Sequence, residues 1–308
     1  MNLRAAGPGW LFCPADRPER FAKAAAAADV VILDLEDGVA EADKPAARKA
    51  LQDTPLDPER TVVRVNASST DELPLDLEAL AGTAYTTVML SKTESAAQVD
   101  ALAPREVIAL IETPRAAVFA AEIAAAERTV ALMWGAEDLV ATLGGSSSRW
   151  PDGTYRDVAR HVRSTALLAA SAFDRIALDA VHLDIRDLDG LRAECDDAVA
   201  LGFAGTVCIH PSQIPVVRAA YRPSEDELAW ARRVLTAAKT ERGVFAFEGR
   251  MVDSPVLKHA GMMLRRGGET PPVCAERFSS VQPDSSRSRV TRRLFTWCAS
   301  TRRTTSSR

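Results

Sequence analysis

The fold is decided by residues 30–67, VVILDLEDGVAEADKPAARKALQDTPLDPERTVVRVNA. This stretch opens with an apolar run, passes through the helical pattern KPAARKALQ, and closes with a second apolar run. Near-continuous Val, Ile and Leu without polar alternation are typical of parallel strands that are buried on both faces. The stretch therefore predicts one strand–helix–strand unit of a parallel sheet.

The same alternation recurs along most of the chain. Apolar runs lie at residues 9–15, 30–37, 61–67, 86–92, 106–113, 129–138, 175–184 and 204–211, with alanine-rich amphipathic stretches between them. A series of this length favours an α/β fold of the TIM (β/α)8 barrel type. An open, doubly wound sheet is the rival, but the first turn, GWLFCPADRP, has no GxGxxG motif of a dinucleotide-binding fold.

The chain of 308 residues suits one large domain or two medium ones. We expect the catalytic barrel to span residues 1–222 and a C-terminal helix and arm, or lid, to span residues 223–268. The appended helix is predicted at 224–243, with Ser224 and Glu227 forming a capping box. Residues 269–308 lose all apolar periodicity, are rich in Ser, Thr and Arg, and are predicted to be disordered.

Composition narrows the class of protein. The formal net charge is −4, and an acidic body argues against nucleic acid as a partner, because phosphate binding requires a clustered basic surface. The five cysteines form no CxxC pattern, which favours free thiols in a reducing compartment. No run reaches the roughly 18 apolar residues of a membrane span, and the first residues lack a signal-peptide pattern. The sequence thus predicts a cytoplasmic protein with no membrane partner.

Charged side chains follow the predicted strands at their carboxyl ends, where a barrel collects its functional groups. Such groups are costly to bury unless they are paired or bind a metal. A ring of structural salt bridges is the alternative explanation for any single one of them, but it explains the whole set less well. The set comprises Asp34, Glu36, Asp37, Arg64, Lys92, Glu112, Glu137, Asp138, Asp184 and His210.

Glu112 and Asp138 follow adjacent strands, which run about 4.8 Å apart. Two carboxylates so close would repel each other unless a cation lay between them, and a hard ion such as Mg²⁺ prefers oxygen ligands. Zinc is disfavoured, because no cysteine or second histidine stands at ligand spacing. Arg64 lies across the barrel mouth, where a guanidinium can stabilise an enolate oxygen. Together these groups suggest that a carbon–carbon bond next to a carbonyl is broken or made.

The chain also resembles the HpcH/HpaI aldolase and citrate lyase beta-subunit family, specifically the stand-alone citrate lyase beta-like proteins. The resemblance covers residues 9 to about 265 and implies a TIM barrel with an appended C-terminal segment. It further implies a trimer or hexamer and Mg²⁺-dependent chemistry on malyl-CoA, citramalyl-CoA or citryl-type thioesters. The matching segments are LFCPADRPERFAKA (11–24), VILDLEDGV (31–39), VVRVN (62–66), ALIETPRA (109–116), WGAEDL (134–139), GTVCIHPSQI (205–214) and GRMVDSPV (249–256).

The resemblance implies roles for the residues at matching positions. Glu112 and Asp138 match the Mg²⁺ ligands, and Arg64 matches the arginine that binds substrate and stabilises the enolate. Asp37 matches an acid near the water shell of the metal, and Glu36 could exchange roles with it.

More distant positions also match. Arg17 and Lys23 resemble the part of the family that meets CoA phosphates; a solvated helix start is the alternative. Asp253 matches an aspartate that, in related CoA lyases, a neighbouring subunit inserts over the active site as acid or base. The arm here is short compared with those lyases, and a helix cap before Pro255 is the alternative.

His210 and the loop at residues 144–148 are expected to support the site rather than to take part in the reaction. His210 is interpreted as a hydrogen-bonding core residue, because a single histidine that ends a buried strand is more often structural than catalytic. Residues 144–148, GGSSS, are interpreted as a flexible active-site loop.

The function implied is a Mg²⁺-dependent carbon–carbon lyase. It would split a β-hydroxyacyl-CoA into a 2-oxo acid or oxaloacetate and a short acyl-CoA, or join them in a Claisen-type condensation. One alternative is a metal-dependent aldolase acting on free 4-hydroxy-2-oxo acids, with a histidine base. Another is a citrate lyase beta subunit that needs a citryl thioester bound to an acyl carrier. A non-enzymatic binding module is disfavoured, because Arg64, Glu112 and Asp138 are all present.

Overall fold

The computed structural model describes residues 3, 5–241 and 243–271. Disorder is predicted from the sequence for residues 269–308. Of these, residues 272–308 lie outside the described residues. The same is true of Cys274 and Cys298. The described residues up to Arg222 form one compact unit, and the described residues from Pro223 onward form another.

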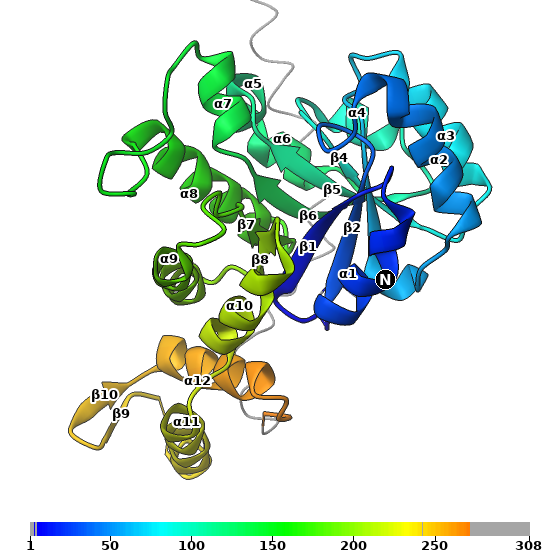
Figure 1. Ribbon diagram of the computed structural model, residues 1–308. Coiled ribbons are helices and arrows are strands. Elements are labelled where there is room, and N and C mark those ends of the chain that lie inside the picture. Colours follow the sequence, from blue (N-terminus) through cyan, green and yellow to red (C-terminus); the bar gives the residue numbers. More distant parts are fainter. Residues whose placement is uncertain (1–2, 4, 242, 272–308) are drawn as a thin grey trace, which may run out of the picture. The chain divides into compact units, whose positions relative to one another are not determined.

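The first unit is a closed barrel of eight parallel strands, in which each strand pairs with the next and β8 pairs with β1 (Figure 1). This closure confirms the predicted TIM barrel and excludes the open-sheet rival. The strands are β1 (Gly9–Pro14), β2 (Val30–Asp34), β3 (Thr61–Val65), β4 (Thr87–Leu90), β5 (Glu106–Ile111), β6 (Thr129–Trp134), β7 (Ile176–Asp179) and β8 (Gly205–Cys208).

Helices that follow the strands surround the barrel. Their alanine-rich faces pack on the outer side of the strands, so the small side chains allow helix and sheet to approach closely. They are α1 (Phe21–Ala27), α2 (Lys44–Asp53), α3 (Glu72–Ala81), α4 (Ala96–Asp100), α5 (Pro114–Val118), α6 (Ala120–Ala125), α7 (Glu137–Thr142), α8 (Asp157–Ala172), α9 (Leu188–Leu201) and α10 (Ile214–Tyr221).

The strands bury two separate apolar layers, because successive side chains point to opposite faces of a sheet. On β2, Val31 and Leu33 join the layer shared with the helices, whereas Val30 and Ile32 join the layer that fills the barrel interior. The interior is thus a packed core rather than a channel, as is usual for this fold. A ligand pocket is therefore expected at the carboxyl ends of the strands, where the active sites of this fold lie.

The second unit is a small helical body with its own apolar core. It contains α11 (Glu225–Ala237), the antiparallel strands β9 (Phe245–Phe247) and β10 (Arg250–Val252), and α12 (Ser254–Arg266). Ser224 and Glu227 form the predicted capping box at the start of α11. The helix ends at Ala237, earlier than predicted, because the amides of Lys239 and Thr240 turn back onto the carbonyls of Thr236 and Ala237.

No helix among the described residues is long and apolar enough to cross a membrane.

Candidate active site

Strand alternation places three of the predicted residues at the barrel mouth. Asp34, Arg64 and Glu112 continue the rows of side chains that fill the barrel interior, since they follow Ile32, Val62 and Leu110 at a spacing of two. Asp34 and Arg64 are also direct partners in the register of β2 and β3. Charged groups therefore cap the apolar core at this end of the barrel.

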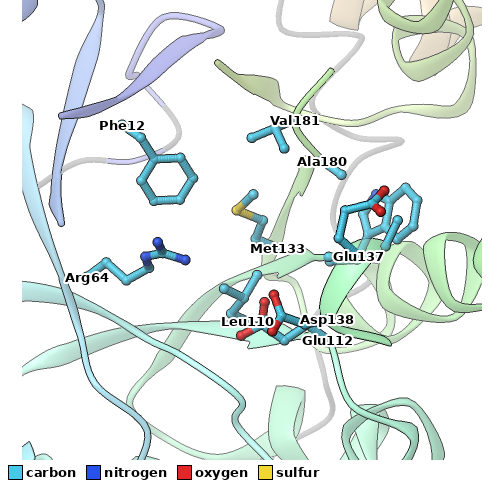
Figure 2. Close-up of a pocket in the computed structure, with 12 residues that line it drawn as sticks. Phe12, Arg64, Leu110, Glu112, Met133, Glu137, Asp138, Ala180 and Val181 are labelled. Carbon is cyan, nitrogen blue, oxygen red and sulfur yellow. The ribbon is translucent and has the colours of Figure 1, made fainter. Parts of the chain in front are cut away.

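Arg64 and Glu112 line a pocket of about 90 Å³. Figure 2 shows Arg64 and Phe12 on one side and the carboxylates of Glu112 and Asp138 on another, with the guanidinium pointing into the space between. The remaining wall is mostly apolar, so the pocket combines an apolar surface with a few convergent charges, as ligand sites usually do. The lining residues are Phe12, Arg64, Leu110, Glu112, Met133, Trp134, Gly135, Ala136, Glu137, Asp138, Ala180 and Val181.

Arg64 is held firmly in one orientation. Its Nε and Nη2 atoms donate to the two carboxylate oxygens of Asp34 at 2.7 and 2.6 Å. Its Nη1 lies 3.0 Å from Glu36 Oε2, and its guanidinium stacks 4.6 Å from the Phe12 ring centre. Burial works against the charge of Arg64, but Asp34 and Glu36 outweigh it and raise the pKa of Arg64 above its ordinary value. The pocket therefore contains a fixed, permanent positive charge.

Glu112 is almost completely buried, at 3% exposed, and forms no ion pair with a described residue. Its Oε1 accepts a hydrogen bond from the Lys92 backbone N–H at 2.8 Å. Burial, reinforced by the negative charges of Asp138 and Glu36 and opposed by Lys92, raises the pKa of Glu112 to about 8. A carboxyl with such a pKa lacks charge compensation, which a bound cation would supply.

The residues present fit a magnesium ion. Glu112 and Asp138 offer only oxygen ligands, and no group of three or more His, Cys, Asp or Glu among the described residues is arranged to hold a metal. In enzymes, Mg²⁺ is usually bound by one or two carboxylates, and waters and substrate complete its coordination shell. Gly135 leaves the necessary space, because a Cβ there would come within 3.0 Å of Glu112 Oε2.

That space gives a testable prediction. Gly135→Ala should displace the Glu112 carboxylate and weaken Mg²⁺ binding, measured by calorimetry, by about tenfold, as changes beside a metal ligand commonly do. Gly82→Ala is the control, since its Cβ would approach at 3.0 Å only the flexible end of Gln52. Equal Mg²⁺ affinity in both variants would show that Glu112 does not depend on the gap beside Gly135.

Lys92 is a charged residue at the barrel mouth whose role the sequence did not indicate. Its ammonium contacts Glu36 and lies 3.5 Å from Asp37 Oδ2 and 3.4 Å from Asp138 Oδ1. Burial opposes its charge, but the hydrogen bond to Glu36 and the surrounding carboxylates raise the pKa of Lys92 above its ordinary value. Its position after an apolar strand was the only sequence signal. Its backbone φ of 49°, in a region that favours glycine, could not be read from the sequence.

Glu36 and Asp37 have different surroundings. Glu36 is buried between Arg64 and Lys92, whereas the Asp37 side chain is 61% exposed and reaches only Lys92. Asp34 was named only as a strand-end acid, yet it forms the bidentate pair with Arg64.

Arg17 and Lys23 are not among the pocket-lining residues. Arg17 pairs with Asp16 at 3.1 Å in an exposed segment after β1, and Lys23 is exposed on α1. Asp253 belongs to the second unit, where it accepts a hydrogen bond from the Val256 backbone N–H at 3.4 Å and caps α12.

The interpretation of His210 as a core residue was wrong. His210 is exposed and caps the short 3-10 helix Pro211–Gln213, with its Nδ1 accepting from the Ser212 backbone N–H at 3.2 Å. The proline that follows favours this extended capping position over a buried strand end. In the loop after α7, Ser148 is buried and donates to Glu137 Oε1 at 2.6 Å.

Comparison with known proteins identifies the family of this chain. The model of the HpcH/HpaI aldolase/citrate lyase family matches residues 9–211. A "Citrate lyase subunit beta-like protein" of Mycobacterium tuberculosis is 79% identical over 269 residues, covering 87% of this chain and 98% of that protein. The mitochondrial citramalyl-CoA lyase of Homo sapiens is 32% identical over 265 residues, covering 75% of this chain and 76% of that protein.

Among solved structures, protein CitE from Mycobacterium tuberculosis in complex with magnesium, acetoacetate and coenzyme A matches with a TM-score of 0.83. It is 79% identical, and the match covers 86% of this chain and 100% of that one. The resemblance predicted from the sequence motifs is thereby confirmed: the chain belongs to the HpcH/HpaI aldolase/citrate lyase family.

Proposed function

We propose that this protein is a Mg²⁺-dependent carbon–carbon lyase that cleaves or forms a β-hydroxyacyl-CoA thioester. The observation that carries the proposal is the pocket in which Glu112 and Asp138 face the fixed guanidinium of Arg64. The similarity to a citramalyl-CoA lyase, and to a structure that contains magnesium and coenzyme A, supports a CoA thioester as substrate.

The two carboxylates have the role of holding the metal. Glu112 would ligate through the oxygen that faces the Gly135 gap, since the other is occupied by the Lys92 N–H. Bound Mg²⁺ would supply Lewis acidity to a β-hydroxyl and an adjacent carboxylate of the substrate.

Arg64 has the role of stabilising the thioester enolate. Its contacts to Asp34 and Glu36 fix its plane before substrate arrives, so no reorganisation is needed as charge develops on the enolate oxygen. Phe12, Leu110, Met133 and Val181 form the apolar wall that excludes water from this charge.

The proton of the β-hydroxyl goes to a carboxylate. We assign this step to Asp253, or to a water molecule held by Asp37, because a carboxylate can act as a general base. Loss of that proton lets the carbon–carbon bond break, and the resulting enolate takes a proton to give a short acyl-CoA. Arg17 and Lys23, both exposed, are assigned to the CoA phosphates.

The decisive experiment is a substrate panel. Purified protein with Mg²⁺ is assayed with malyl-, citramalyl-, citryl- and hydroxymethylglutaryl-CoA, and with free 4-hydroxy-2-oxo acids. Cleavage of at least one CoA ester and of no free acid is expected. Cleavage of free acids alone would support the aldolase alternative, and activity only with a citryl thioester on an acyl carrier protein would support the citrate lyase subunit.

Asp253 leads to a prediction about assembly. We propose a homotrimer, or a hexamer built from trimers, in which Asp253 of one subunit completes the pocket of a neighbour; closed symmetry is usual for such enzymes. Asp253→Ala and Glu112→Gln should each be inactive alone. Mixed under conditions that exchange subunits, they should regain activity at interfaces that pair an intact barrel with an intact arm.

The control for the mixture is each variant incubated alone under the same exchange conditions. A mixture that stays inactive after proven exchange, or full activity of Asp253→Ala alone, would leave Asp253 as a helix cap only.

A further inference from the structure

A group of buried polar side chains joins the ends of β2 and β3 to the helices α2 and α3. It consists of Lys44, Arg48, Asn66 and Asp76, and we call it the Asp76 network. All four are buried, and none of them lines the pocket. The roles assigned above to the active-site residues do not use these groups.

The network is fully connected by hydrogen bonds. Asp76 accepts from Arg48 Nε at 2.8 Å, from the Asn66 backbone N–H at 2.9 Å and from Asn66 Nδ2 at 2.7 Å. The Asn66 side-chain carbonyl oxygen in turn accepts from Lys44 Nζ at 2.5 Å. A network satisfied in this way favours a single arrangement of the segments that it joins.

The segments that it joins carry the charged groups of the active site. Lys44 Nζ and Asn66 Nδ2 both donate to the Leu35 carbonyl oxygen, each at 3.0 Å. Leu35 stands between Asp34 and Glu36, the two carboxylates that contact Arg64. The Leu35 N–H donates to the Arg64 carbonyl at 3.0 Å, and Asn66 follows Arg64 by two residues.

Stability alone does not account for such a network. Removing charged groups from water is costly, and apolar side chains of similar volume are often as stabilising or more so. A catalytic guanidinium, in contrast, must be held within about 0.5 Å of its productive position by the surrounding residues. The connection from Asp76 through Asn66 to the Leu35 backbone supplies that constraint.

We propose that Lys44, Asn66 and Asp76 are positioning residues, which set the orientation of Arg64 through the backbone of Leu35 and Asn66. This role rests on the proposed function, because it concerns the same guanidinium. It predicts that a substitution in the network displaces the Arg64 guanidinium. The metal ligands Glu112 and Asp138, which follow other strands, should keep their positions.

The test is Lys44→Met, which keeps an unbranched side chain but removes the ammonium from the Leu35 carbonyl and from Asn66. Lys49→Met on the same helix is the matched control, since Lys49 is exposed and pairs only with Asp53 across one helical turn. For Lys44→Met we expect kcat per folded molecule to fall by about tenfold or more, because small displacements of catalytic groups are costly. KM and Mg²⁺ affinity should stay near wild type, and Lys49→Met should change none of these.

A second readout does not depend on turnover. The Nε–Hε NMR signal of Arg64, assigned by its loss in Arg64→Lys, should shift or broaden in metal-free Lys44→Met and stay unchanged in Lys49→Met. If Lys44→Met fails to fold, Asp76→Asn, which has the same shape, is measured in the same two ways.

An unchanged Arg64 signal together with wild-type kcat per folded molecule would overturn the proposal, whatever happens to melting temperature. If the wild-type protein cleaves no thioester, the proposed function fails, yet the Arg64 signal still decides whether the network positions that residue.

Discussion

Glu112→Gln is expected to abolish Mg²⁺ binding and to lower turnover by about a thousandfold or more, since the metal contributes several kcal/mol of charge stabilisation. The carboxamide has nearly the shape of the carboxylate, so the hydrogen bond from the Lys92 N–H can persist and the fold should remain intact. Calorimetric Mg²⁺ titration and steady-state kinetics measure the two effects. Glu122→Gln, an exposed change on α6, is the matched control.

The same variant should change how stability depends on pH. In the metal-free protein the pKa of Glu112 is raised from 4.5 to about 8, so its stabilising contribution is complete below pH 4.5 and is lost as pH rises through 8. Glutamine cannot ionise and avoids that loss. In EDTA, the melting temperature of Glu112→Gln minus that of wild type should therefore increase as pH rises from about 5 to about 8.

Full activity of Glu112→Gln in the presence of EDTA would end the Mg²⁺ hypothesis. A melting-temperature difference that stays constant with pH would show instead that Glu112 is already ionised without metal.

Arg64→Lys should lower turnover by about a hundredfold, the usual effect of removing one donor that stabilises an oxyanion. A lysine ammonium is a point charge and cannot reproduce the two parallel hydrogen bonds to Asp34 or the stacking on Phe12. Mg²⁺ affinity is expected to remain close to wild type, because Arg64 does not hold the metal. Kinetics and Mg²⁺ calorimetry are compared with Arg192→Lys, an exposed arginine that pairs with Asp196 on α9.

Rates for Arg64→Lys must be expressed per folded molecule, because weakening a buried ion pair also lowers stability. A large loss of Mg²⁺ affinity would move Arg64 from substrate binding to support of the metal site. Wild-type turnover would remove it from the mechanism.

The barrel could be predicted from the sequence because its signal is local and repeated. Each strand is a short run of Val, Ile and Leu, and each connecting helix is an alanine-rich amphipathic stretch, so eight weak signals reinforce one another. The capping box at Ser224 was equally local, since its two residues are three positions apart. The end of α11 was less predictable, because helix ends depend on the turn that follows.

The approach of Glu112 to Asp138 could also be predicted, because the carboxyl ends of barrel strands always meet at one mouth. The two residues follow adjacent strands, so topology alone brings them together. His210 follows a strand too, yet its side chain turns outward to cap a helix. Position at a strand end thus determines which residues come near the mouth but not which way each side chain points.

The sequence by itself determined the barrel, the set of charged groups at its mouth and the family to which the chain belongs. Only the tertiary structure decided that Asp34 holds Arg64 and that Lys92 lies among Glu36, Asp37 and Asp138. It also decided that burial, reinforced by nearby carboxylates, raises the pKa of Glu112. The physical reason is distance in the chain. Each of these contacts joins residues 20 or more positions apart in the chain. Their register, side-chain direction and burial arise only when the barrel closes.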